Sequence, residues 1–366
     1  FKLEKLQREL VKKNGFTWAK NIYWGNLKSP FKGHNPDWTA KAALEFIEKH
    51  KEQPFYLHCC STLLHGPNGE WFKSMMEKEL VTGEGYLKKP LNLIDRQSVW
   101  ARIKKAGLTE AEVGYLWMDD SLGLILDKLD ELGIANNTIV VFVSDHGSER
   151  KGSLIKNRGT EIPCLIRWPK VIKPGSVSRG LFQNTDFVPT WFELAQAETP
   201  VDYHMDGESL VPMFKDPSVS IRQYIYAEQG PARAIKTADW EYISIRYTDE
   251  QVAATQGNRA DRAFKTFLGL SGGISRAKDF HPGTFSADQL YHLSYDMDSQ
   301  KNLAEDLGYG GQLKKMKRML TKTVKNMGPR PYGDFVPGKG TNDKKTSQQV
   351  LDKIYAHYAS QRQKKK

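Results

Sequence analysis

The stretch from Asn136 to Gly147, NNTIVVFVSDHG, constrains the fold more than any other part of the chain. Its apolar residues, 139–143, follow one another without alternating polar positions. A strand of this kind is typically buried on both faces of a parallel sheet covered by helices. The strand ends directly at Asp145 and His146, so we expect an α/β domain whose sheet presents these two residues at a strand end.

A long helical pattern precedes this strand. Thr109 and Glu112 have the spacing of a capping box, and Gly133 is placed to end a helix that starts after Thr109. Helix followed by buried strand is the repeating unit of an α/β fold.

A second helix and strand lie earlier in the chain. Apolar residues recur at helical spacing over 39–53, and the apolar, aromatic stretch 54–64 follows as a predicted buried strand that contains Cys59 and Cys60. This strand ends at His65. Because ligands of α/β sheets bind beyond the carboxyl ends of the strands, we expect His65 to share a rim with Asp145 and His146.

The pattern of apolar and polar residues along the chain changes near residue 217. The segments RQYIYAEQG, RAIKTADWEYISIRY and DQLYHLSYD are short, alternating or aromatic, which predicts an antiparallel sheet. We therefore expect three parts: the later portion of a catalytic α/β domain over 1–217, an antiparallel subdomain with a closing helix over 218–327, and a solvated basic tail over 328–366.

The net charge restricts the kinds of partner that the chain can bind. The chain of 366 residues carries a net charge of +11, which favours anionic ligands. It contains no zinc-finger, RNA-binding or basic-zipper pattern, so we expect no nucleic-acid partner. No apolar run is long enough to span a membrane. The three cysteines predict neither a disulfide framework nor a zinc site.

Asp145 and His146 have two interpretations by residue type. Asp-His-Gly is compatible with an ordinary turn, and carboxylate oxygen with imidazole nitrogen is also a metal-ligand pair. A role for Asp145 in orienting His146 is less favoured, because neighbours on an extended segment point in opposite directions. Lys151 follows closely enough to bind an anion at the same place.

As a whole the chain resembles the sulfatase family of the alkaline phosphatase superfamily over about residues 35–325. PFYLHCCSTLLHGP is similar to the family's strand ending in a His-x-Pro motif. VVFVSDHG is similar to the strand leading to its metal-binding Asp-Asn or Asp-His pair, and KGSLIKNRGTEIPCLIRWP to the segment with its active-site Lys. The resemblance implies an alkaline-phosphatase-like α/β fold, a mostly parallel central sheet flanked by helices, and a small antiparallel C-terminal subdomain.

The resemblance also implies site roles. Asp145 and His146 would bind a divalent metal, most often Ca²⁺ in the family, with Mg²⁺ or Mn²⁺ as alternatives because His is an unusual ligand for a hard cation. His65 and Lys151 would contact the sulfate and act in catalysis. One extra residue stands between the Lys and the Ile-Pro that follows, so Lys156 competes for the role of the active-site lysine. Arg158 would reach the substrate.

One family motif is not found. Sulfatases carry a Cys-or-Ser-x-Pro-x-Arg motif near the N-terminus, whose Cys or Ser becomes the formylglycine nucleophile. The printed sequence has no such motif. We therefore expect the nucleophile on sequence upstream of Phe1, and we expect these 366 residues to be inactive by themselves.

The expected activity is hydrolysis of sulfate esters, with a sulfated small molecule or a sulfated glycan as substrate, and the positive net charge favours the glycan. Trp71, Trp100 and Trp240 are candidate sugar-stacking residues. Two alternatives stay open: a phosphodiesterase or phosphonate hydrolase of the same superfamily, and a non-catalytic protein that binds anionic glycans. By resemblance the protein would be periplasmic, extracellular or lysosomal, and its oligomeric state is open.

Overall fold

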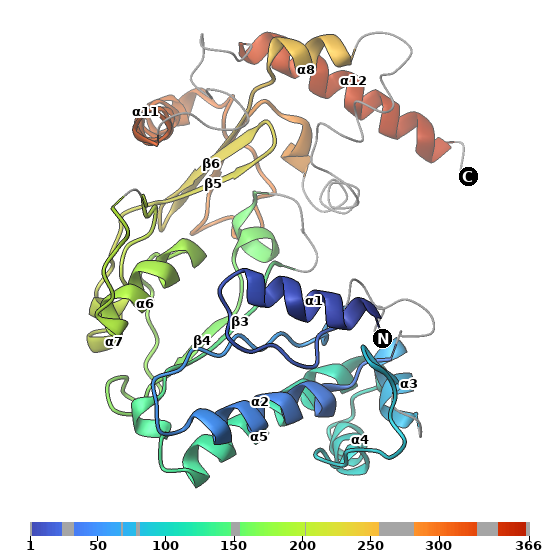
Figure 1. The fold of residues 1–366 in the computed structure, drawn as a ribbon. Helices are drawn as coiled ribbons and strands as arrows, with labels where there is room; N and C mark the ends of the chain where they lie inside the picture. The colour runs from blue at the N-terminus through green and yellow to red at the C-terminus, as the bar shows by residue number, and fades with distance from the viewer. Residues whose placement is uncertain are drawn as a thin grey trace. The chain divides into compact units, whose positions relative to one another are not determined.

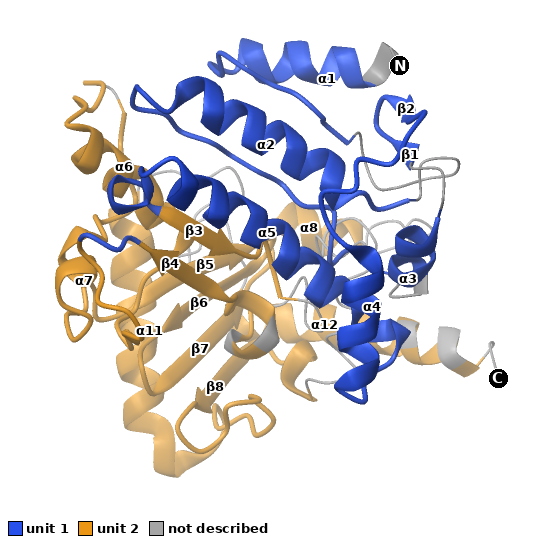
Figure 2. Ribbon diagram, turned by 90° about the horizontal axis from the view of Figure 1, so that it is seen from below, with its two compact units in different colours: residues 1–139, 168–170 blue, residues 140–167, 171–366 orange. Residues whose placement is uncertain are grey.

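The computed structural model describes residues 2–23, 33–66, 69–77, 81–147, 154–201, 203–255, 282–327 and 343–363. The chain divides into two compact units (Figures 1 and 2). Unit 1 comprises residues 1–139 and 168–170, and unit 2 comprises residues 140–167 and 171–366. No helix among the described residues is long and apolar enough to cross a membrane.

Unit 1 is built mainly from helices. Its elements are α1 (Lys2–Lys13), α2 (Pro36–His50), α3 (Gly69–Met76), a two-stranded ladder of β1 (Val81–Thr82) and β2 (Gly85–Tyr86), α4 (Arg96–Lys105), η1 (Glu110–Glu112), α5 (Val113–Glu131) and η2 (Ala135–Asn137). The predicted capping box is present, because Thr109 accepts from the backbone while Glu112 accepts from the Thr109 N–H at 2.8 Å. The core of this unit lies between α3, α4 and α5 and includes Trp71, Val99 and Trp117.

Asp37 ties the start of α2 to the segment before α4. Its carboxylate is fully buried, accepts the backbone N–H groups of Leu93 and Ile94 at 3.0 Å each, and forms an ion pair with Arg96 at 3.0 Å. Arg96 also lies over the ring of Trp117, 4.9 Å from its centroid. A buried carboxylate with this many partners fixes the segment before α4 to the start of α2.

The predicted buried strand over 54–64 is wrong. The described residues provide no hydrogen-bonded partner strand for this segment, so it forms no ladder, and residues 63–64 lie in a turn. Cys59 and Cys60, expected in the core, are exposed. A strand is buried only where neighbouring strands and helices cover it, and an apolar sequence does not by itself supply that cover.

Unit 2 begins with β3 (Val140–Val143), which pairs antiparallel with β4 (Cys164–Arg167). The residues of β3 are half-buried, with Val143 exposed, so the expected burial on both faces is not found. All ladders among the described residues are antiparallel. β4 is the one described neighbour of β3, and a strand with one neighbour is less covered than a strand inside a parallel sheet.

The predicted antiparallel sheet is confirmed. It has the order β5 (Ile225–Gln229), β6 (Ala232–Lys236), β7 (Trp240–Ile245) and β8 (Asp288–His292), visible side by side in Figure 2. The helical and turn elements of unit 2 are η3 (Lys156–Thr160), η4 (Asn184–Asp186), α6 (Phe187–Ala195), α7 (Val211–Lys215), α8 (Asp249–Ala254), η5 (Pro282–Phe285), η6 (Leu307–Tyr309), α11 (Gly310–Asn326) and α12 (Lys344–Gln363).

Both faces of this sheet are covered. Ile235, Tyr242 and Leu290 pack against α11, whereas their neighbours in sequence Ala234, Ile243 and Tyr291 pack against Leu154 and Ile155. Successive residues of a strand point to opposite faces. The sheet therefore separates α11 from the segment that leads into η3.

Part of the expected basic tail is structured. Residues 344–363 form helix α12, and Val350, Leu351 and Ile354 are buried against Ile245, Tyr247 and Ala287 of the sheet region. These three apolar residues share one helical face. The many lysines around them give the segment the composition of a solvated tail, although its apolar face is sufficient for docking.

Candidate active site

Asp145 and His146 lie in a bend directly after β3. The bend is held by Ser144, whose backbone N–H donates to Pro163 O at 3.3 Å and whose hydroxyl donates to His146 O at 2.9 Å. Because the backbone bends here, the two side chains do not point apart as on an extended strand. Asp145 Oδ2 lies 3.4 Å from His146 Nε2, and the Asp145 side chain is 85% exposed.

The geometry of this pair is compatible with a shared cation. His146 Nδ1 donates to Gly147 O at 2.9 Å, since a carbonyl can only accept, and this leaves Nε2 as the lone-pair nitrogen. A backbone carbonyl that fixes the tautomer of a histidine is a usual feature of metal-binding histidines. Two ligands bound about 2.4 Å from one cation at right angles would lie at about this separation.

The pair does not complete a metal site among the described residues, because no group of three or more His, Cys, Asp and Glu side chains there could hold an ion. The sequence prediction that Asp145 and His146 bind Ca²⁺, Mg²⁺ or Mn²⁺ stays a prediction. The two residues fit as part of a ligand set, not as the whole of one.

The predicted lysine segment lies beside this bend. Gly147 N–H donates to Gly159 O at 3.2 Å, which joins the Asp145–His146 bend to η3, a single π-helical turn. Lys156 and Arg158 are both residues of η3, the turn that this bond joins to the Asp145–His146 bend. Lys151 lies outside the described residues.

A buried lysine that the sequence analysis missed supports η3. Lys236 on β6 donates from Nζ to the carbonyl of Leu154, shortly before the turn, and to the hydroxyl of Thr160, the last residue of the turn. It also forms an ion pair with Glu241 at 3.1 Å, and both side chains are buried. Lys236 and Glu241 are register partners across the β6–β7 ladder, and opposite charges commonly pair at such positions.

His65 belongs to unit 1 and is exposed. Its backbone N–H donates to Thr62 O at 3.1 Å, and its carbonyl accepts the indole N–H of buried Trp71 at 2.9 Å. Its Nδ1 donates to Gly66 O at 3.0 Å, so Nε2 is the atom left to meet a ligand. These bonds fix the backbone of His65 and the tautomer of its ring.

His34 is a second histidine near this turn that the sequence analysis did not single out. Its Nδ1 lies 3.1 Å from Thr62 Oγ1, and its backbone N–H donates to Ser74 Oγ at 3.0 Å. Burial, together with the charge of His65, lowers the pKa of His34 to about 4. His34 is therefore neutral near pH 7 and packs beneath the turn that carries His65.

The candidate sugar-stacking tryptophans differ in exposure. Trp71 is 1% exposed and belongs to the core of unit 1, where Gly114 allows α5 to approach its ring. Trp240 contacts the rings of His292 and Tyr309. Trp71 is thus excluded as a surface for sugar stacking.

Comparison with known proteins identifies the family. The sulfatase family model matches residues 7–197, and the model for the C-terminal region of N-sulphoglucosamine sulphohydrolase matches residues 146–250. An ulvan-active sulfatase of Formosa agariphila is 30% identical over 55% of this chain and 38% of its own length. An N-acetylglucosamine-6-O-sulfatase of Bacteroides thetaiotaomicron is 27% identical over 57% of this chain and 34% of its own.

Solved structures show the same fold at low identity. A Bacteroides thetaiotaomicron protein solved in work on the metabolism of multiple glycosaminoglycans has a TM-score of 0.53 and 21% identity, and the match covers 80% of this chain and 54% of that one. The PsFucS1 sulfatase from Pseudoalteromonas has a TM-score of 0.50 and 18% identity, with 83% and 54% covered.

The fold is therefore the alkaline-phosphatase-like fold of sulfatases, with the antiparallel four-stranded sheet in its C-terminal part. This chain belongs to the sulfatase family, as its motifs predicted. It spans less than two fifths of the length of the two curated relatives above.

Proposed function

We propose that the whole protein hydrolyses sulfate esters on a carbohydrate. The observation that carries the proposal is the family match over 7–197 together with the Asp145–His146 bend beside η3. Two of the curated relatives act, by name, on ulvan and on N-acetylglucosamine 6-O-sulfate. The net charge of +11 is favourable for an anionic substrate.

The overall reaction would consume one water for each ester, and it would release the alcohol and hydrogen sulfate. Asp145 and His146 would contribute to holding a divalent cation, most often Ca²⁺ in this family, which when bound polarises a sulfate oxygen. The nucleophile would be a formylglycine hydrate, as the family resemblance implies.

The residues of this chain would bind and orient the ester. His65 presents Nε2, which when protonated can donate to the bridging oxygen as the S–O bond breaks. Lys151 or Lys156, with Arg158, would neutralise the negative charge on the sulfate oxygens. The Lys236–Glu241 pair would keep η3 in place, since Lys236 bonds to a carbonyl shortly before the turn and to the hydroxyl of its last residue.

The test is turnover by the full-length natural protein of 4-nitrophenyl sulfate, a sulfated oligosaccharide and bis(4-nitrophenyl) phosphate. We expect turnover of the sulfate esters, and a loss of about 10²–10³-fold in kcat/KM for His65→Ala and for one of Lys151→Ala and Lys156→Ala. Turnover of the phosphate diester alone would instead identify a phosphodiesterase. Binding of sulfated glycan with no turnover of any ester would identify a non-catalytic binding protein.

A further inference from the structure

Helix α11 carries a row of positively charged side chains. Its 17 residues include six lysines and arginines and no acidic residue. Four of the cations, Lys314, Arg318, Lys322 and Lys325, are spaced four, four and three residues apart, so they lie along one face of the helix. All four are exposed, and we refer to them as the cationic stripe.

The stripe lies on the solvent side of the helix. The buried ridge of α11 is Met316, Leu320 and Val324, which packs on the sheet. Each stripe residue before Lys325 precedes a ridge residue by two positions, about 200° around the helix. The stripe therefore points away from the sheet, and the sheet separates it from the segment leading into η3.

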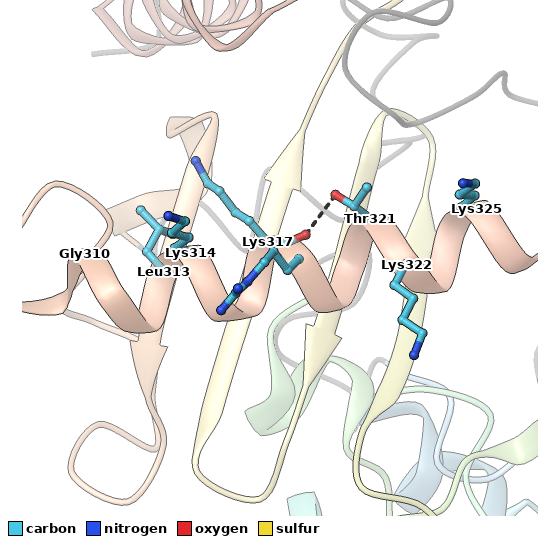
Figure 3. Close-up of a pocket in the computed structure, with 8 residues that line it drawn as sticks. Gly310, Leu313, Lys314, Lys317, Thr321, Lys322 and Lys325 are labelled. Atoms are coloured by element: carbon cyan, nitrogen blue, oxygen red, sulfur yellow. Dashed lines mark hydrogen bonds between the residues drawn. The ribbon is translucent and has the colours of Figure 1, made fainter.

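A shallow groove of about 570 Å³ runs beside the stripe (Figure 3). Its remaining walls are Gly310, Leu313, Lys317 and Thr321. Lys317 is already paired, since it bonds to buried Asp288. In the part of the chain that the structure describes, no carboxylate forms an ion pair with any residue of the stripe.

The two longest segments outside the described residues are basic by composition. Residues 256–281 contain five Lys and Arg against two Asp, and residues 328–342 contain two against one. Like charges three or four residues apart also repel each other and destabilise a helix. The stripe therefore has an energetic cost that no ion pair among the described residues offsets.

We propose that the cationic stripe of α11 is a docking surface for an extended anionic polysaccharide. The four cations span about 16 Å along the helix axis, so a linear chain with sulfate or carboxylate groups can meet them in succession. The site is separate from the proposed active site, because the two lie on opposite faces of the sheet. A polymer bound to the stripe would stay attached to the protein through sugar units other than the one whose sulfate ester is hydrolysed.

Other occupants are less favoured by the same side chains. Single-stranded nucleic acids bind where aromatic platforms accompany the basic groups, and no aromatic residue lines this groove. A membrane-bound helix places large apolar side chains beside its basic face, whereas the groove offers one leucine. A second copy of this chain would be repelled by its net charge of +11.

The experiment measures binding of a fluorescent heparin dodecasaccharide by the full chain. The stripe variant replaces Lys314, Arg318, Lys322 and Lys325 with Ser, and the control replaces four exposed cations of unit 1, Lys13, Lys41, Lys49 and Lys105, with Ser. Both variants lose the same net charge. We expect the stripe variant to bind about tenfold more weakly and the control to bind like the wild type, because exposed ionic contacts are individually modest but add along a polymer.

Salt provides a second readout. Loss of contacts to a polyanion reduces the number of released counterions, so the slope of log affinity against log salt becomes smaller in the stripe variant. Equal weakening in both variants, or wild-type binding by the stripe variant, would overturn the proposal. So would binding of duplex DNA or phosphatidylserine vesicles through the same four residues more tightly than the oligosaccharide.

Turnover of 4-nitrophenyl sulfate separates this proposal from the proposed function. The stripe variant of the full-length protein should keep the wild-type rate on this small ester, because the stripe is remote from η3. If no ester is hydrolysed but the stripe still binds the oligosaccharide, the docking surface stands and the proposed activity fails.

Discussion

Lys236 and Glu241 face each other across the β6–β7 ladder with Nζ 3.1 Å from Oε1, and neither side chain is exposed. The same Nζ also donates to Leu154 O, shortly before η3, and to Thr160 Oγ1 at the end of η3. One buried cation thus joins the antiparallel sheet to the turn that carries Lys156 and Arg158. The antiparallel sheet is a structural support for the candidate site.

Replacing this lysine should destabilise the protein and release the turn. Lys236→Met leaves Glu241 buried and unpaired, which we expect to lower the free energy of unfolding by about 3–5 kcal/mol in urea titrations. We also expect faster tryptic cleavage after Lys156 and Arg158, measured by mass spectrometry.

Two further variants test whether Lys236 itself holds the turn. Lys236→Met/Glu241→Leu should recover much of the stability, since a buried pair can be replaced by apolar side chains, but not the resistance of η3 to trypsin. Lys215→Met, at an exposed position at the end of α7, should change neither property. A double variant with full trypsin resistance would mean that packing, and not Lys236, holds the turn.

His34 should make stability depend on pH. Its folded pKa of about 4 is below the ordinary value of 6.5, so the unfolded state binds the proton first as the pH falls. The folded state is not penalised above about pH 6.5, and stability is lost as the pH falls from there toward 4, by on the order of 3 kcal/mol.

The measurement is urea unfolding of the wild type and His34→Gln at several pH values between 7.5 and 4.5. The wild type should lose more stability over this window than the variant, because Gln does not titrate. Parallel curves for the two proteins would contradict the role given to His34.

Gly114 should be intolerant of a side chain. A Cβ at this position would lie 2.5 Å from two ring carbons of Trp71, whose indole N–H bonds to His65 O. Gly114→Ala should therefore displace the ring and destabilise the protein by about 1–3 kcal/mol despite the better helix propensity of Ala.

Thermal unfolding measures this effect, and Gly123→Ala is the matched control on the same helix, since nothing lies within 4 Å of its added Cβ. We expect the control to be neutral or slightly stabilising. Equal midpoints for the two variants would show that Trp71 adjusts without cost.

Asp145 and His146 should both matter for cation binding in the full-length protein. Asp145→Asn removes the negative charge of an oxygen ligand and His146→Gln removes the imidazole nitrogen, and we expect either to weaken Ca²⁺ binding by about tenfold or more in calorimetric titrations. Asp206→Asn is the control, because Asp206 Oδ1 forms a similar pair with His204 Nε2 at 3.5 Å elsewhere in unit 2. Unchanged affinity in both site variants would exclude the pair as ligands.

Several elements were predictable from local sequence. The Thr109–Glu112 capping box and the helix after it follow from spacing within one or two turns. The alternating segments that became β5–β8 follow from a period of two. The family was also predictable, because its motifs are short and occur in order along the chain.

Other elements depended on segments far apart in the sequence. The apolar stretch 54–64 has the composition of a buried strand, but burial needs neighbours on both sides. Helix α12 has the composition of a solvated tail, but Ile354 and its apolar neighbours pack against apolar residues of the sheet region. In both cases the composition is compatible with two outcomes, and packing decides between them.

The sequence by itself determined the family, local helices and antiparallel strands, and the identity of the candidate ligands. Only the tertiary structure decided that Lys236 reaches Leu154, 82 residues away, and that the backbone bend brings Asp145 and His146 to 3.4 Å. The physical reason is how far apart in the sequence the interacting residues lie. Helix caps and strand periodicity are set by neighbours along the chain, whereas a buried charge or a ligand pair depends on where the folded backbone places distant groups.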